Sequence, residues 1–150
     1  MKFIKNYCIE IVLLTMILWG CHFNNQYFDR EKDKKDAEMI TNELYKEIKS
    51  KNYENTIPLF SDKFLVVTNR EDIMKMYLTL NNKLGDLIDI KLIECKTRVI
   101  EGYKASAEYS LTYLNKYSKY EATEKINLIR EIDGKIKIIS YNLNSKGLME

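Results

Sequence analysis

Between residues 103 and 113, apolar and polar side chains alternate without interruption. The apolar positions are Tyr103, Ala105, Ala107, Tyr109, Leu111 and Tyr113. Successive side chains of a strand point to opposite faces of the sheet, so the pattern predicts a strand with one face in the core and one in water. Such a strand needs a second layer of structure packed on its buried face.

Three further strands are predicted around it. Glu101-Gly102 and Asp133-Gly134 are expected turns, and residues 115–119 are an expected loop. The four predicted strands cover residues 86–100, 103–113, 120–132 and 135–143. The order predicts an antiparallel meander in the second half of the chain.

The first half of the chain shows helical spacing instead. Ala37, Ile40, Leu44 and Ile48 recur at three- and four-residue steps, which predicts a helix over 31–51. A short helix is expected over 56–60 and a brief strand over 64–67. Thr68 and Glu71 have capping-box spacing, and the stripe Ile73, Met74, Tyr77, Leu80 and Leu84 ends at Gly85, which predicts another helix.

Helices followed by a meander predict an α+β fold with helices packed on a curved antiparallel sheet of about four long strands. Over residues 31–145 the chain resembles the nuclear transport factor two-like superfamily, a cone-shaped, cystatin-like architecture, and small uncharacterised bacterial lipoproteins that carry it. The resemblance is carried by Asn52-Tyr53, Leu59–Phe64, Leu84–Leu87, Tyr109–Tyr113 and Gly134–Tyr141. These are packing patterns, so the resemblance implies a fold and assigns no activity.

The first 20 residues have the organisation of a secretory signal. Lys2 and Lys5 precede the apolar run Ile11–Trp19, which ends at Gly20-Cys21. A membrane-spanning helix needs about 20 apolar residues, so we expect a removable signal peptide over 1–20.

Leu18-Trp19-Gly20-Cys21 resembles the lipobox of bacterial lipoproteins. The resemblance implies that diacylglycerol is attached to Cys21, that the chain is cleaved before it, and that the new amino terminus is acylated, with palmitate. Residues 21–30 would then be the lipidated cysteine and a tether, and 31–150 a single domain. The protein is expected to be exported and anchored to the cell envelope, on the outer face of the plasma membrane or the periplasmic face of a Gram-negative membrane. The alternatives are an ordinary signal peptide and a buried apolar helix.

The residues of the expected domain exclude several kinds of chemistry. Cys95 would be the one thiol left beside Cys21, and the only histidine, His22, lies in the tether, so no Cys/His pair can form in the domain. No metal-binding or cofactor-binding motif is visible, and we assign no metal, cofactor or catalytic residue. The net charge of +2 gives no footprint for nucleic acid. The 11 tyrosines fit the codon bias of an AT-rich genome and by themselves indicate no site.

Glu124 is the residue most in need of a structural explanation. In the register Ala122, Glu124, Ile126, Leu128 it falls on the apolar face, where an isolated carboxylate is costly. Tyr109 or Tyr113 on the neighbouring strand could donate a hydrogen bond to it, which makes these three a candidate ligand-binding group. A bulge, or a position near the strand end, would instead place Glu124 in water.

Three functions remain open at this point. The leading hypothesis is a non-enzymatic envelope lipoprotein that binds a small apolar ligand or a protein partner. The second is an envelope immunity or inhibitor protein directed against a toxin or hydrolase. The third is a small isomerase or hydratase, which requires Glu124 to be buried, partnered and beside a cavity.

Overall fold

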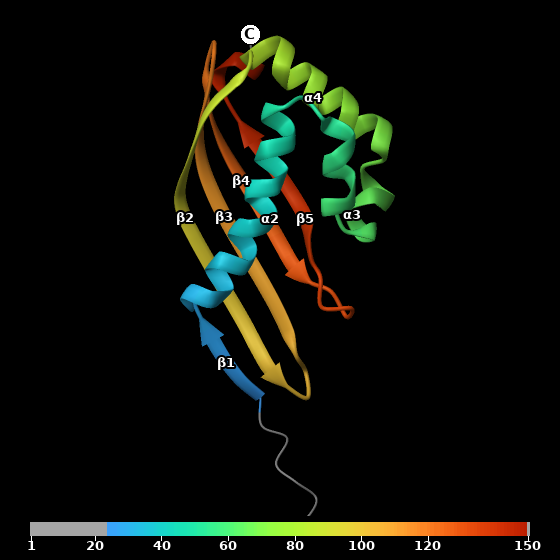
Figure 1. Cartoon of the computed structure of the whole chain (residues 1–150), viewed down its shortest axis with the longest axis vertical. Coiled ribbons are helices and arrows are strands. Elements are labelled where there is room, and N and C mark those ends of the chain that lie inside the picture. The colour runs from blue at the N-terminus through green and yellow to red at the C-terminus, as the bar shows by residue number, and fades with distance from the viewer. Residues whose placement is uncertain (1–23, 150) are drawn as a thin grey trace, which may run out of the picture.

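The computed structural model describes residues 24–149, which form an α+β fold with helices packed against a curved, five-stranded antiparallel sheet (Figure 1). The sheet order is β1-β2-β3-β4-β5. Its strands are β1 Asn24–Phe28, β2 Leu87–Gly102, β3 Ser106–Tyr117, β4 Glu121–Arg130 and β5 Ile136–Asn144. The helical segments are α2 Glu31–Lys49, the 3-10 helix η1 Tyr53–Leu59, α3 Asp62–Val67, α4 Arg70–Leu84 and the 3-10 helix η2 Lys146–Leu148.

The fifth strand, β1, lies within the segment 21–30 that the sequence predicted to be a tether. It pairs antiparallel with the edge of β2, from Asn24 opposite Gly102 to Phe28 opposite Arg98. Only Tyr27 is even half-buried, so no hydrophobic alternation marked the strand. Backbone pairing holds it in place, and the Asp29 carboxylate adds a hydrogen bond from the backbone N–H of Thr97 at 2.8 Å.

The strand predicted over 64–67 is wrong, because these residues belong to α3. Ser61 precedes the helix, and its hydroxyl accepts the backbone N–H of Phe64 at 3.1 Å. This cap starts a helical turn in spite of the β-branched residues that follow. Val66 and Val67 are left 86% and 85% exposed, whereas a buried strand would have covered one of them.

The helix predicted after residue 68 is confirmed as α4, with its cap one residue later than expected. Asn69 is the N-cap, and its side chain accepts the backbone N–H of Asp72 at 2.9 Å. At the other end Gly85 has φ +86°, which favours glycine. The chain there meets the β3–β4 turn, since the N–H of Ser118 donates to the carbonyl of Asp86 at 2.8 Å.

The predicted meander is confirmed, but two of its boundaries move. The β2–β3 turn lies at 103–105, so Tyr103 is 74% exposed instead of facing the core. The expected loop at 115–119 is wrong at its start, because β3 continues to Tyr117 and buries both Asn115 and Tyr117. The polar residues there share the inward register of Tyr113, which outweighs their preference for loops.

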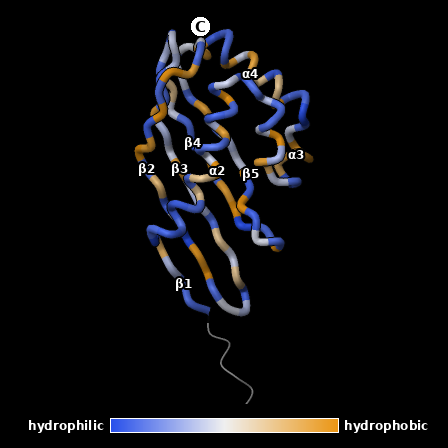
Figure 2. The backbone as a smooth tube through the Cα atoms, in the orientation of Figure 1, coloured by the Kyte–Doolittle hydropathy of each residue, from blue (hydrophilic) through white to orange (hydrophobic). Residues whose placement is uncertain are grey.

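The core lies between the inner face of the sheet and the helices. The predicted inward positions Ala107, Tyr109, Leu111 and Tyr113 are all buried, and Ala37, Leu44 and Ile48 of α2 pack against the sheet. Hydrophobic and hydrophilic residues alternate along the elements, and no segment is uniformly apolar (Figure 2). The two long helices, α2 and α4, and strands β2 to β5 therefore each contribute one face to a shared core.

Candidate functional site

Glu124 lies in the middle of the core. The predicted β4 register is confirmed: Ala122, Glu124, Ile126 and Leu128 are all buried, and Glu124 has no exposed surface. A register shift in the pairing of β4 with β5 occurs between Asn127 and Leu128 and leaves the inward direction of Glu124 unchanged. The carboxyl group is therefore enclosed on the helix-covered face of the sheet.

Three tyrosine hydroxyls surround the Glu124 carboxyl group. Tyr117 donates to Oε1 at 2.7 Å, and Tyr141 and Tyr45 donate to Oε2 at 2.6 and 3.0 Å. The donors come from β3, β5 and α2. We call Glu124 with these three residues the tyrosine cage. Its hydrogen bond from Tyr45 of α2 connects the helical layer to the sheet.

The cage also explains how a carboxyl group can be accommodated in the core. Burial of an unpaired carboxylate is strongly unfavourable, whereas hydrogen bonds to both oxygens offset that cost. Burial first, and the nearby Glu124 charge second, raise the pKa of Tyr45, Tyr117 and Tyr141 well above the usual value for tyrosine. The three hydroxyls therefore keep their protons, which the hydrogen bonds require.

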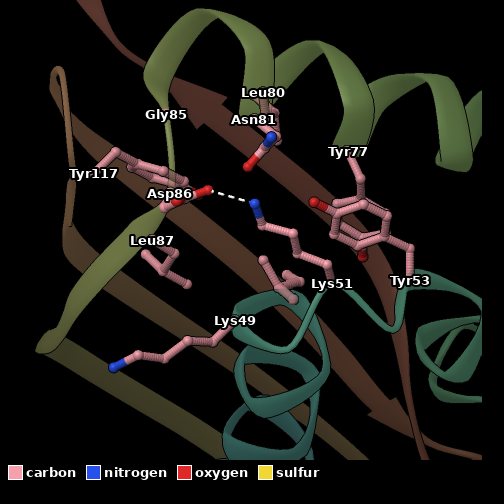
Figure 3. Close-up of a pocket in the computed structure, with 11 residues that line it drawn as sticks. Lys49, Lys51, Tyr53, Tyr77, Leu80, Asn81, Gly85, Asp86, Leu87 and Tyr117 are labelled. Atoms are coloured by element: carbon pink, nitrogen blue, oxygen red, sulfur yellow. Dashed lines mark ion pairs between the residues drawn. The ribbon is translucent and has the colours of Figure 1, made fainter.

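A very small cavity shares one residue, Tyr117, with the cage, and Figure 3 shows the side chains that line it. Tyr53, Tyr77 and Tyr117 line it, and its volume is about 20 Å³, which is enough for roughly one water molecule. At its edge the Lys51 ammonium group and an Asp86 carboxylate oxygen lie 2.7 Å apart. Because Tyr117 also donates to Glu124, the cavity approaches the cage but has no room for a substrate.

The two tyrosines that the sequence grouped with Glu124 have other partners. Tyr113 lies opposite Glu124 in the β3–β4 register, but its hydroxyl is 2.6 Å from Oγ1 of Thr41. The Tyr109 hydroxyl accepts a hydrogen bond from Arg130 at 3.0 Å. Burial raises the pKa of Tyr113 to about 12. The structure therefore does not bring Tyr109, Tyr113 and Glu124 together as one group.

The three actual donors could have been found from sequence only in part. Tyr45 directly follows Leu44 on the apolar side of the first predicted helix, and Tyr141 alternates with apolar residues in the last strand. Tyr117 was assigned to a loop, so its inward direction gave no signal. Pairing of the strands across Asp133-Gly134 places Tyr141 opposite Ile126, one inward position from Glu124.

Cys95 lies in β2 and packs against the core. Burial raises the pKa of its thiol to about 11. The thiol is therefore protonated at neutral pH, as is typical of a small hydrophobic residue and not of a nucleophile.

The larger hollows on the surface include one of about 530 Å³ beside the β3–β4 turn, lined by Lys119, Tyr120 and Ser145, and two others. The sheet hollow, of about 500 Å³, lies on the face without helices and is lined by Phe28, Lys96, Arg98, Ser110, Ile129 and Ile139. The end hollow, of about 580 Å³, lies between the start of α2 and the β2–β3 and β4–β5 turns. It is lined by Arg30, Asp36, Tyr103, Ala107, Arg130 and Ile132. The sheet hollow and the end hollow are both wide enough for a ligand or part of a partner protein.

The charged groups of the end hollow largely neutralise one another. Arg130 donates to Asp36 at 2.9 Å, and Arg30 donates to Asp33 at 2.6 Å and to Glu101 at 2.9 Å.

Residues 24–149 contain no group of acidic, cysteine or histidine side chains arranged to hold a metal ion. In the same part of the chain, no helix has both the length and the apolar composition needed to cross a membrane.

No protein-family model matches the chain, and no curated protein or solved structure is similar enough to it to show a relationship. The predicted lipid attachment residue, Cys21, and the predicted signal peptide lie outside the described residues.

Proposed function

We propose that this protein is a lipid-anchored, non-enzymatic protein of the cell envelope that binds a partner protein through the helix-free face of its sheet. The observation that supports a non-enzymatic role is the closed interior of the domain. Glu124 is fully buried, both its oxygens accept hydrogen bonds from tyrosine hydroxyls, and the neighbouring cavity has room for about one water molecule. The anchor rests on the order of charged residues, apolar run and Cys21 in the sequence.

An enzyme that uses Glu124 as its acid receives less support from this geometry. A general acid must come within hydrogen-bond distance of the group to which it transfers a proton. At Glu124 those positions are taken by Tyr45, Tyr117 and Tyr141. We therefore interpret the tyrosine cage as a structural element, and we propose that the domain is a filled version of the cone-like, cystatin-like architecture.

The sheet hollow is the surface that we propose for binding. Phe28 is 63% exposed and Ile139 is 36% exposed there, beside the charged side chains of Lys96, Arg98 and Glu108. Apolar contact area with a charged border is typical of protein interfaces. An envelope immunity or inhibitor protein is one form of this proposal. A small apolar ligand in the same hollow is the second candidate, which the hollow's volume of about 500 Å³ supports.

The anchor is tested by intact mass and membrane partition of the full-length protein beside Cys21→Ser. We expect the wild type to lose residues 1–20, gain acyl mass and sediment with membranes, and the variant to do none of these. If both proteins keep the signal, or both are soluble without acyl mass, the anchor is excluded.

Binding is tested with a photo-crosslinking amino acid at position 110, which lines the sheet hollow, and at Leu78, an exposed residue of α4, as the matched control. We expect a discrete protein adduct from position 110 and none from position 78. Ile129→Asp, within the hollow, should abolish the adduct. A small molecule that co-purifies with the wild type but not with Ile129→Asp would favour the second candidate. The absence of both an adduct and a co-purifying molecule would contradict binding at this face.

A further inference from the structure

The tip of the β2–β3 hairpin lies beside the first described residues of the chain. Asn24 pairs with Gly102, and the Asn24 side-chain oxygen accepts the backbone N–H of Lys104 at 3.1 Å. Figure 1 shows this tip and the start of β1 together at one extremity of the long axis, with the C-terminus at the opposite extremity. The chain therefore enters the domain at a fixed point next to the hairpin tip.

The covalent distance from the predicted lipid to this point is short. Three residue steps separate Cys21 from Asn24, and each spans at most about 3.6 Å, so the reach is about 11 Å. The headgroup layer of one bilayer leaflet is roughly 5–8 Å thick. With its acyl chains in the hydrocarbon, Cys21 holds Asn24 within a few ångströms of the lipid surface.

The hairpin tip has the chemistry of a residue cluster at a lipid interface. Tyr103 is 74% exposed, and Lys104 and Ala105 beside it are exposed too. Tyrosine rings are enriched at the headgroup level of membranes, and lysine is attracted to anionic lipid phosphates. Glu101, which directly precedes the tip in the sequence, is paired with Arg30 at 2.9 Å, so its charge is compensated.

We propose that residues 102–105 rest on the lipid surface, with the Tyr103 ring in the interfacial layer and Lys104 among the phosphates. The inference rests on the proposed lipid attachment at Cys21. It adds an orientation: the domain stands on its hairpin end, with α4 and the tyrosine cage directed away from the membrane. The sheet then stands perpendicular to the membrane, and the sheet hollow faces parallel to the membrane plane, where a partner in the envelope can reach it.

The sequence offers a clean reporter for this orientation. The only tryptophan of the chain, Trp19, lies in the segment predicted to be removed. In the full-length protein, processed by its host, Tyr103→Trp therefore introduces a single tryptophan at the tip. Leu78→Trp, at a position 60% exposed on α4, is the matched control.

The proteins are reconstituted in vesicles of phosphatidylcholine and phosphatidylglycerol, with and without bromine on the acyl chains. We expect the tryptophan emission of the Tyr103→Trp protein to shift to the blue and to lose most of its intensity in brominated vesicles, and that of the Leu78→Trp protein to change little. Equal quenching in the two variants would mean that the domain lies on its side, and quenching in neither that it stands off from the surface. Either result overturns the proposal.

Two controls separate the possible failures. Intact mass and flotation with the vesicles report acylation of Cys21, so an unacylated protein refutes the anchor. An acylated and floating Tyr103→Trp protein whose emission is not quenched refutes only the orientation. A blue shift that grows with protein density and is insensitive to bromine would assign the tip to contact with a second copy, which also overturns the proposal. Circular dichroism confirms that both variants are folded.

Discussion

Helices cover the inner face of the sheet at one end of the molecule, and at the other end the β2–β3 hairpin extends beyond them (Figure 1). At the covered end, the carboxyl group of Glu124 is fully buried and accepts hydrogen bonds from three tyrosines. At the hairpin end, large side chains such as Tyr103 and Ile132 face solvent around the end hollow. Folding stability is therefore concentrated at the covered end, which leaves the hairpin end free to carry contacts with its surroundings.

The largest expected effect is that of Glu124→Ala. Removal of the carboxyl group leaves three hydroxyls without their acceptor, and each buried polar group left unsatisfied typically costs about 1–3 kcal/mol in the free energy of unfolding. Urea denaturation followed by circular dichroism measures the loss. Glu121→Ala, in the same strand but exposed, is the matched control and should change the stability by less than about 0.5 kcal/mol. Similar stabilities of the two variants would contradict the role of the cage.

Gly85→Ala, at the covered end, is expected to have the next largest effect. Gly85 has φ +86° and ψ −162°, a conformation restricted almost entirely to glycine, with a cost of about 1–3 kcal/mol for other residues. An added Cβ would also lie 1.9 Å from the Ser118 hydroxyl oxygen. Gly134→Ala, in the β4–β5 turn, is a matched control with φ +85° and no atom within 4 Å of the added Cβ. We expect thermal unfolding to show the larger loss for Gly85→Ala, and equal losses would mean that the β3–β4 turn adapts.

The tyrosine cage predicts a loss of stability in alkali. Burial and the Glu124 charge raise the pKa of Tyr45, Tyr117 and Tyr141 in the folded state, whereas in the unfolded state tyrosine ionises at about pH 10. Above that pH the folded state holds more protons, so the free energy of unfolding falls by about 1.4 kcal/mol per pH unit for each tyrosine. Below it this contribution is complete.

The alkaline prediction is measured by urea denaturation between about pH 9 and 11, on either side of the ordinary tyrosine pKa, in the wild type and in Tyr117→Phe. The variant should lose stability with pH less steeply, by the contribution of one tyrosine. The same two proteins near neutral pH provide the control, because there neither should depend on pH through this group. An unchanged slope in the variant would show that Tyr117 is not held protonated by the cage.

The smallest effect is expected at the hairpin end. Ile132 is fully exposed in the β4–β5 turn, so Ile132→Ser removes no buried surface and should change the free energy of unfolding by less than about 0.5 kcal/mol. Leu80→Ser is the matched control at the covered end, where the side chain is 7% exposed, and should cost several times more. A large loss in the free energy of unfolding for Ile132→Ser would contradict the conclusion that the covered end supplies most of the folding stability.

The sequence predicts most of this architecture, because hydrophobic periodicity reports burial. The 31–51 helix, the stripe from Ile73 to Leu84 and the inward register of Glu124 are all visible as spacing. The sequence did not predict β1 or α3 correctly, because neither element has a buried periodic face. β1 is held by backbone pairing with β2, and α3 begins at the capping hydroxyl of Ser61. The cage was predicted only through its acid, because its donors lie far apart in the chain and meet only in three dimensions.

The position of β1 also has a consequence for the order of events when the chain is made. Residues 24–28 pair with 98–102, which follow all the α-helices in the described part of the chain. If the chain is exported from its N-terminus, as proposed above, β1 stays unpaired until β2 has crossed the membrane. Under the proposed lipid attachment at Cys21, the edge of the sheet nearest the lipid therefore forms only after the N-terminus has been exported.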